Sequence, residues 1–261
     1  KHKPDVVSLN ETWLDEGIEP EGTWLEEAGY AWYGRNRSTK KGGVGLLITL
    51  DIAGPATPSG HKNVYLQPPF NAGGHTGTLW VTIQLAGGQN INIGTSYIEP
   101  ATSCRSHLGI NHIDMWDAIT TSLVKQANKG LTVWCADANA HVNGLTERLP
   151  PSEPKAPDRA TELRGDGTAR PATEYGRKLI DALSAANMLT IHDRKRGRAP
   201  PIWSHTCTHH SSYTTDGADG NTQSTCDYIA VNARAFPTTT AAVSDIMQGL
   251  SDHRLLTCTI D

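Results

Sequence analysis

The stretch TVWCADANAHVNG, residues 132–144, opens as an apolar run and continues into alternating polar side chains. Asp137, Asn139 and His141 follow one another at every second position. Side chains alternate across a strand, so a strand ending here places Cys135 and Asp137 on one face. A carboxylate on the inward face of a buried strand needs a compensating partner, because burying a lone charge costs several kcal/mol.

Two other carboxylates stand in the same relation to apolar strands. The core face of a first strand, Val7 and Leu9, leads to Glu11, and Asp227 begins a run with Ile229 on its face. A divalent metal and a phosphate would explain all three carboxylates together. Mg²⁺ takes hard oxygen ligands and typically binds one or two carboxylates plus substrate phosphates.

Each of these features also has an interpretation without chemistry. Glu11 could cap the following turn, the segment 137–139 could form an Asx-turn, and Asp227 could pair with a structural arginine. The motif Ser251-Asp252-His253-Arg254 could cap the last strand. The arrangement that all four share, polar residues at the ends of apolar strands, favours a functional site.

The elements that must position these residues follow from apolar periodicity. Strands are predicted at residues 5–9, 43–50, 78–85, 91–98, 131–136, 189–192, 228–231 and 255–260. Helices are predicted over His112–Ala127 and Thr173–Asn187, the second with Thr173 as N-cap. Residues 54–76 and 149–171 look like loops. Many strands with few helices indicate sheets packed face to face with helices outside.

Composition bounds the class of protein. The chain has 261 residues, 37% of them hydrophobic, which fits a single large domain. The net charge of -4 does not point to a polyanionic partner and does not exclude one. No apolar run approaches the roughly 18 residues of a membrane helix. The five cysteines are scattered and form no CxxC pair, which favours reduced thiols in an intracellular compartment over a disulfide framework.

A set of motifs in fixed order resembles a known family. The motifs are LNETW (9–13), KGGVGLLI (41–48), SYIEP (96–100), ADANAH (136–141), CDYIAV (226–231) and SDHRLL (251–256). Together they resemble the endonuclease/exonuclease/phosphatase superfamily, which includes DNase I and the apurinic/apyrimidinic endonucleases. The GGVG strand, the Tyr-x-x-Pro ending and the NAH motif look most like endonuclease domains of non-LTR (LINE-type) retrotransposons. The resemblance implies a DNase I-like α/β fold, a four-layered sandwich of two mostly antiparallel sheets flanked by helices.

The resemblance also implies roles for individual residues. Glu11 looks like the metal ligand, with Asp252 as a second candidate, for Mg²⁺ or alternatively Mn²⁺. Asp137 looks like the residue that orients or deprotonates the attacking water, and Asn139 helps to hold water or phosphate. His253 looks like the phosphate-side imidazole with Asp227 as its orienting carboxylate. Tyr97 would hydrogen-bond the phosphate, and the candidates for supporting or contacting the substrate are Ser251, Trp203, Arg196 and Lys41.

The candidate DNA contacts have alternatives. Arg196 belongs to the run DRKRGR (193–198), which is either a solvated turn or a phosphate contact with salt-dependent binding. Lys41 belongs to a second basic cluster with Arg35, Arg37 and Lys40. Trp203 is either a packing residue or a neighbour of DNA. The segment WSHTCTHHSS (203–212) suggests zinc only weakly, because zinc ligands usually come in pairs from two places.

The chain departs from the family pattern in two places. The family's first strand carries an asparagine that helps to build the metal site, and no such strand precedes Lys3, so we expect that the strand is missing. Many apurinic endonucleases have asparagine at the position of Pro100, so proline here argues against that branch.

The interpretation is a Mg²⁺-dependent endonuclease that nicks double-stranded target DNA and leaves a 3′-hydroxyl to prime reverse transcription. The resemblance implies a nuclear protein that acts without a membrane, as part of a larger polypeptide with a reverse transcriptase domain. The alternatives are another phosphoesterase of the superfamily, acting on abasic DNA, RNA, an inositol phosphate or a lipid headgroup, and a catalytically inactive nucleic-acid-binding domain.

Overall fold

The computed structural model of the chain describes residues 3–14, 20, 23–36, 42–68, 77–100, 112–153, 171–191, 194, 207–210, 221–246 and 253–260. The chain divides into two compact units, Lys1–Asp137 and Ala138–Asp261. The interpretation of residues 1–261 as a single domain stays a prediction.

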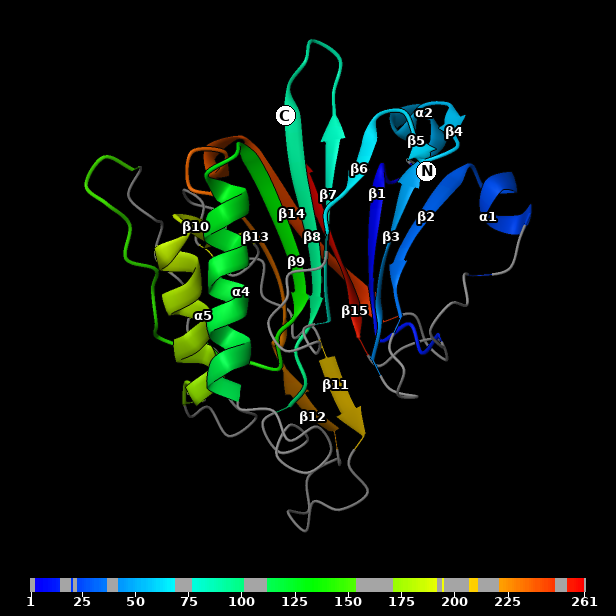
Figure 1. The fold of residues 1–261 in the computed structure, drawn as a ribbon. Helices are drawn as coiled ribbons and strands as arrows, with labels where there is room; N and C mark the ends of the chain where they lie inside the picture. Colours follow the sequence, from blue (N-terminus) through cyan, green and yellow to red (C-terminus); the bar gives the residue numbers. More distant parts are fainter. Residues whose placement is uncertain are drawn as a thin grey trace. The chain divides into compact units, whose positions relative to one another are not determined.

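Besides a two-stranded sheet, the first unit has two sheets that position the candidate site. In one, β1 (Val6–Asn10), β3 (Val44–Thr49) and β2 (Tyr30–Arg35) are antiparallel neighbours in that order. In the other, β9 (Leu131–Asp137), β8 (Asn90–Tyr97), β7 (Gly77–Gln84) and β6 (Val64–Leu66) follow one another. Strands β8 and β9 run parallel, whereas β7 is antiparallel to both of its neighbours (Figure 1).

A hydrophobic core lies between these two sheets. It draws alternate residues from both, because each strand presents every second side chain to one face. Its buried members are Ala31, Val44, Leu46, Ile48, Ala53, Val64, Leu79, Val81, Ile83, Ile93 and Tyr97. The predicted packing of sheets face to face is therefore confirmed within the first unit.

Helix α4 (His112–Ala127) covers the opposite face of the second sheet. The Asn92 amide of β8 donates to the carbonyl of Gln126 at 3.3 Å, and Asn92 points away from the core that contains Ile93. Trp116 and Leu123 of α4 are buried at the helical spacing that predicts this face. The helix begins and ends at the predicted residues.

The predicted loop over residues 54–76 is wrong in its first half. After α2 (Leu50–Ala53), the chain forms β4 (Ala56–Thr57), β5 (Gly60–His61) and then β6. These strands are only two or three residues long, too short for an alternating pattern to be recognised. Residues 69–76 lie outside the described part.

In the described residues of the second unit, the chain forms three antiparallel strand pairs and one long helix. The pairs are β10 (Met188–Thr190) with β13 (Asp227–Asn232), β11 (Cys207–His210) with β12 (Asn221–Ser224), and β14 (Thr239–Ile246) with β15 (Arg254–Ile260). A single 3₁₀ turn, η1, spans Phe236–Thr238. Helix α5 (Glu174–Ala185) begins at Thr173, whose hydroxyl accepts a hydrogen bond from the Gly176 amide, so the predicted N-cap is confirmed.

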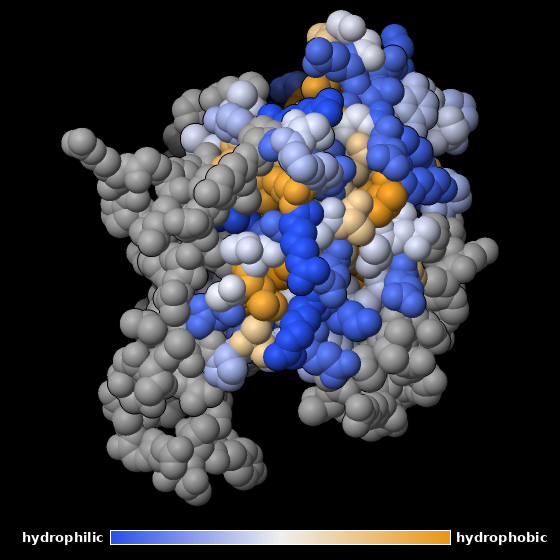
Figure 2. Space-filling model, turned by 90° about the vertical axis from the view of Figure 1, so that its left-hand side faces the viewer, coloured by the Kyte–Doolittle hydropathy of each residue, from blue (hydrophilic) through white to orange (hydrophobic). Residues whose placement is uncertain are grey.

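The hydropathy of the helices and of the surface, and the state of the cysteines, can be compared with the expectations from composition. In the part of the chain that the structure describes, no helix is long and apolar enough to span a membrane. Figure 2 shows one face on which hydrophilic residues alternate with small hydrophobic patches, as on most globular proteins. Among the described residues, Cys135, Cys226 and Cys258 form no disulfide.

Candidate active site

The first group of candidate residues lies at the carboxyl ends of β8 and β9. The two strands are parallel, so their ends meet at one edge, and Tyr97 pairs in register with Asp137. Asp137 is only 5% exposed. On β8, this face also carries Ile93 and Tyr97 of the core, so Asp137 faces the β1-β3-β2 sheet. The prediction of an inward-facing carboxylate at this strand end is confirmed.

Glu11 reaches the same edge by a route that differs from the predicted one. The inward face of β1 carries Val6 and Ser8, because Val6 packs on the core and the Ser8 hydroxyl donates to Thr95 of β8 at 2.7 Å. Leu9, which was expected on the core face, is 38% exposed. Strand alternation alone would therefore point Glu11 outward. Instead, Glu11 has a positive φ of 53°, which ends the strand and breaks the alternation.

The glycine pair of the KGGVG motif supports this turn. Gly42 and Gly43 have φ of 91° and 88°, a conformation that residues with a Cβ rarely adopt. Their carbonyls accept the amides of Trp13 and Thr12 at 3.0 and 3.3 Å. A Cβ on Gly43 would also press on the Thr12 side chain. The glycines thus let β3 approach the segment that carries Glu11.

Tyr97 connects Glu11 with Asp137. Its hydroxyl makes a side-chain hydrogen bond to Glu11. The pKa of Tyr97 is raised, first by burial, then by this hydrogen bond and by the negative charges of Glu11, Asp137 and Glu99. Tyr97 is therefore a neutral phenol that donates to carboxylate. We call Glu11, Tyr97 and Asp137 the Glu11 cluster.

The donor set of the Glu11 cluster fits a hard divalent cation. Two carboxylates and a neutral hydroxyl offer oxygen ligands only, the chemistry that Mg²⁺ selects. Asp137 is nearly buried, and its charge acts on the same phenol that Glu11 binds. A cation would offset the negative charge that both carboxylates bring to the phenol. Among the described residues, Glu11 is the one that could hold it, and Asp137 adds negative charge at the same edge.

The second group lies at the start of β13. Asp227 Oδ2 and His253 Nδ1 are 2.8 Å apart. An ionised carboxylate can only accept hydrogen bonds, so Nδ1 carries the proton and donates it. This fixes the tautomer and leaves Nε2 as the atom for other chemistry. The predicted partnership between residues 26 positions apart in the sequence is confirmed as a contact, with the imidazole 30% exposed.

Asn139 lies in a loop that is held at several points within the second unit. The Ala138 amide donates to the carbonyl of Cys226 at 2.9 Å, next to Asp227. The Tyr228 hydroxyl donates to the carbonyl of Ala140 at 2.9 Å. Asn139 itself has a positive φ of 46°, which asparagine tolerates better than most residues. The loop is thereby fixed to the strand that carries Asp227.

Five predicted residues lie outside the described part of the chain. They are Asp252, Ser251, Trp203, Arg196 and Lys41. Their roles stay predictions.

The structure places one residue of each basic run, and it corrects the expectation for Arg194. Arg194, in the run expected to be solvated or to contact phosphate, is buried and forms an ion pair with Glu147. Arg35 donates to the carbonyl of Thr78 at 2.9 Å, and its burial lowers the pKa of the guanidinium. Arg194 therefore satisfies an interior acceptor instead of standing in solvent, whereas Arg35 is half-buried.

Asn10 is a residue that sequence reasoning missed. In the side-chain orientation that forms the most hydrogen bonds, its amide oxygen accepts from the Asp137 amide. Its nitrogen donates to the Ser96 carbonyl and the Thr95 hydroxyl, and each of the three distances is 3.1 Å. Asn10 thus ties the end of β1 to β8 and β9, directly before Glu11. The signal that the sequence offered was its position at the end of a strand, directly before the predicted ligand Glu11.

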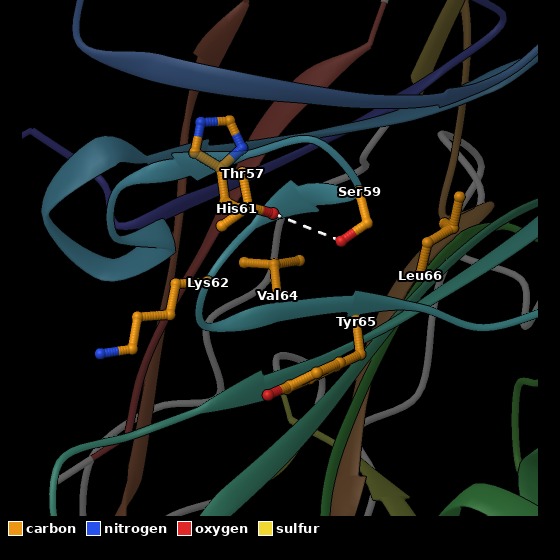
Figure 3. A pocket seen from close by; sticks show the side chains of 7 residues that line it. All are labelled: Thr57, Ser59, His61, Lys62, Val64, Tyr65 and Leu66. Carbon is orange, nitrogen blue, oxygen red and sulfur yellow. Dashed lines mark hydrogen bonds between the residues drawn. The ribbon is translucent and has the colours of Figure 1, made fainter.

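A pocket of about 470 Å³ in the first unit is separate from these residues (Figure 3). It is lined by Thr57, Ser59, His61, Lys62, Val64, Tyr65 and Leu66. Val64 pairs with Ile83 at the far end of β7, whereas Tyr97 pairs with Gly77 at the near end. The pocket therefore lies at the opposite end of the sheet from the Glu11 cluster.

The comparisons with known proteins identify the fold. The sequence matches no protein-family model and no curated protein. Among solved structures, the chain is similar to the 3′ phosphatase NExo from Neisseria bound to a product DNA hairpin, with 13% identity, a TM-score of 0.62, and coverage of 99% of this chain and 89% of that one. An AP endonuclease from Archaeoglobus fulgidus gives 16% identity, a TM-score of 0.60 and the same coverage, 99% and 89%.

The endonuclease domain of TRAS1, a telomere-specific non-LTR retrotransposon, gives 14% identity, a TM-score of 0.51, and coverage of 89% of this chain and 80% of that one. The chain therefore has a DNase I-like α/β fold, as the motifs predict.

Proposed function

We propose that this chain is a metal-dependent endonuclease that hydrolyses phosphodiesters of double-stranded DNA. The single observation that carries the proposal is the 2.8 Å contact between His253 Nδ1 and Asp227 Oδ2. An imidazole held by a carboxylate is the base-and-orienter arrangement of hydrolytic enzymes. The fold supports it, because the similar structures are those of DNA-processing enzymes by their names.

The Glu11 cluster would serve the metal and the water. Glu11 is the proposed ligand, and Asp137 orients the attacking water or accepts its proton. When bound, Mg²⁺ or Mn²⁺ supplies positive charge that offsets charge developing on the phosphoryl and leaving oxygens. Tyr97, kept neutral by its raised pKa, donates to Glu11 and contacts the phosphate.

The residues of the second unit would serve the phosphate. Asp227 holds the proton on Nδ1 of His253, so Nε2 faces the phosphoryl group and donates to its oxygen when protonated. Asn139 holds water or phosphate through its amide. Asp252, Ser251, Trp203, Arg196 and Lys41 keep the metal-side and substrate-side roles that the resemblance implies.

Nicking of supercoiled plasmid tests the proposal. The parent should convert plasmid to open circles with Mg²⁺, and EDTA should abolish this. Asp137→Ala and His253→Ala should each lower the rate by about a hundredfold or more, whereas the exposed Asp117→Ala on α4 should match the parent. Intact nicking by Asp137→Ala or His253→Ala would overturn the assignment of the site.

The proposed biological role is target nicking for a non-LTR retrotransposon, joined to a reverse transcriptase domain and acting in the nucleus. It requires a 3′-hydroxyl at the nick. A DNA polymerase should therefore extend the nicked product without prior phosphatase treatment. Products that need phosphatase before extension would contradict this role.

AP endonuclease activity is the second candidate, because two of the similar structures are AP endonucleases. The match to one of them extends over 89% of that enzyme's chain. A duplex oligonucleotide with one abasic analogue separates the candidates. Cleavage at the abasic position, with intact duplex left uncut, favours repair. Cleavage of both favours target nicking.

A further inference from the structure

A second set of metal-ligating side chains overlaps the His253–Asp227 pair. Cys226, Asp227 and His253 each offer one ligand atom, and these atoms lie within 4.8 Å of one another. The Cys226 thiol donates to Asp227 Oδ2 at 3.4 Å, and His253 Nδ1 lies 2.8 Å from the same oxygen. We call these three residues the Cys226 cluster.

The elements that carry the Cys226 cluster hold it together. Asp227 begins β13 and Cys226 precedes it, while His253 stands directly before β15. The Cys226 carbonyl accepts the Ala138 amide at 2.9 Å, which fixes the backbone at the cysteine. Cys226 is 4% exposed, whereas the side chains of Asp227 and His253 are 15% and 30% exposed. An ion would reach the thiol from the imidazole side.

The ligand chemistry of the Cys226 cluster differs from that of the Glu11 cluster. One sulfur, one imidazole nitrogen and one carboxylate oxygen form a mixed set that zinc prefers, whereas Mg²⁺ prefers oxygen ligands alone. Three protein ligands plus water complete the usual four-coordinate zinc sphere. The two clusters should therefore select different ions.

We propose that Cys226, Asp227 and His253 form a zinc-binding site, and that bound Zn²⁺ inhibits nicking. The inhibitory part rests on the function proposed above, and the binding part does not. On binding, the thiol releases its proton to solvent; Nδ1 loses the proton that it shares with Asp227 while Nε2 takes up one from solvent, so the ring stays neutral and binds the metal through Nδ1. The bond that orients His253 is replaced by bonds to the metal, so the imidazole no longer presents Nε2 in its working orientation.

Cobalt substitution tests binding without any need for catalysis. Co²⁺ bound through a thiolate gives a sulfur-to-metal charge-transfer band in the near ultraviolet. The band should be present in the parent and in Cys258→Ser, the matched control at a partly buried thiol on β15. It should vanish in Cys226→Ser. Zn²⁺ affinity, from competition with a chromophoric chelator, should fall by at least about tenfold in Cys226→Ser.

A second ligand variant protects the test against misfolding. His253→Gln changes a side chain that is 30% exposed, so the variant should fold, and it should lower Zn²⁺ affinity while Cys258→Ser leaves it unchanged. A parent without the charge-transfer band, or equal Zn²⁺ affinity in parent, Cys226→Ser and His253→Gln, would overturn the site.

Plasmid nicking tests inhibition. With Mg²⁺ saturating, micromolar Zn²⁺ should slow the parent and Cys258→Ser, each compared with its own rate without Zn²⁺, and should slow Cys226→Ser far less. Zinc binding without loss of nicking, or equal inhibition of Cys226→Ser, would overturn the inhibitory part. A parent that shows the cobalt band and never nicks would instead contradict the proposed endonuclease.

Discussion

Asp227 is a single residue whose expected effect, the choice of the His253 tautomer, can be tested by substitution. It accepts the Nδ1 proton of His253 and so selects the imidazole tautomer. Asp227→Asn keeps the size of the side chain, but its amide can donate to Nδ1 and favour the opposite tautomer. We expect kcat for nicking to fall by about a hundredfold or more, with a smaller change in KM.

Asp181→Asn is the matched control for this prediction, because Asp181 is exposed on α5 of the same unit. Steady-state nicking of plasmid gives kcat and KM for both variants. A kcat for Asp227→Asn close to that of the control would show that the orienting bond has no catalytic role.

Tyr97 should matter through its hydroxyl alone. Tyr97→Phe removes the donor to Glu11 and keeps the ring that belongs to the core. Removal of a group that orients a metal ligand typically costs about 10–100-fold in metal affinity or activity. We therefore expect a higher Mg²⁺ concentration for half-maximal nicking. Tyr65→Phe, at an exposed tyrosine of β6, should leave it unchanged.

Among the candidate residues that the structure describes, Asp137 has a placement that the sequence predicts, whereas Glu11 is placed by a feature that the sequence does not reveal. The end of β9 delivers Asp137 by strand alternation, as predicted. Glu11 arrives by a positive φ that alternation cannot reveal, with Asn10 and the Gly42–Gly43 pair supporting the turn. The hydrogen bonds between this turn and the glycine pair join segments some thirty residues apart in the sequence. No local sequence pattern reveals a contact at that separation.

Among the elements, helix α5 packs closely against the loop that carries Asn139. A Cβ on Gly176 would collide with the carbonyl oxygen of His141, a backbone atom that cannot rotate away. The Thr173 hydroxyl accepts the amides of both His141 and Gly176, so the helix start and the loop share one anchor. Gly176→Ala should destabilise the protein by about 1–3 kcal/mol.

The same change should also slow nicking, because the helix must move away from the loop that carries Asn139. Urea unfolding gives the loss of stability, and plasmid nicking at a temperature where both proteins are folded gives the rate. The exposed Arg177→Ala, one residue further along α5, is the control. A destabilised Gly176→Ala variant with the parental rate would separate loop position from catalysis.

The buried pair of Glu147 and Arg194 gives another prediction for an element. Glu147 also accepts the amide of Thr190 in β10, so the pair attaches the segment after the Asn139 loop to that strand. Arg194→Met leaves a buried carboxylate without its cation and should cost about 3–5 kcal/mol in the free energy of unfolding. The double variant Glu147→Leu with Arg194→Met should recover most of this loss in urea unfolding. Equal losses in the single and double variants would contradict it.

Elements with a strong local pattern are the ones that the sequence predicts. The 3.6-residue spacing of α4 and the cap of α5 are local, and both are confirmed. Strand β2 was missed because glycine and aromatic residues interrupt its alternation, and β14 because TTAAVSDI is rich in small and polar residues. Each is defined by pairing with the strand that follows it, β3 or β15, and not by a pattern of its own.

At the scale of the whole molecule, metal binding and cooperativity can be measured together. The Glu11 cluster belongs to the unit Lys1–Asp137, so a bound ion stabilises that unit directly. At a hundred times its Kd, Mg²⁺ should add about 2.7 kcal/mol by mass action. If the chain unfolds as one domain, calorimetry should show one transition, raised by roughly 5–10 °C.

The number of calorimetric transitions that Mg²⁺ shifts tests whether the two units unfold together. If Lys1–Asp137 unfolds independently, Mg²⁺ should move one transition and leave the other in place, which would contradict the single-domain prediction. Glu11→Gln should abolish the shift in either case, because an amide oxygen carries no charge for the cation. Glu26→Gln, at an exposed residue of the short helix α1 (Thr23–Glu27), should keep it. An equal Mg²⁺ shift in Glu11→Gln and the parent would show that the stabilising ion binds away from the Glu11 cluster.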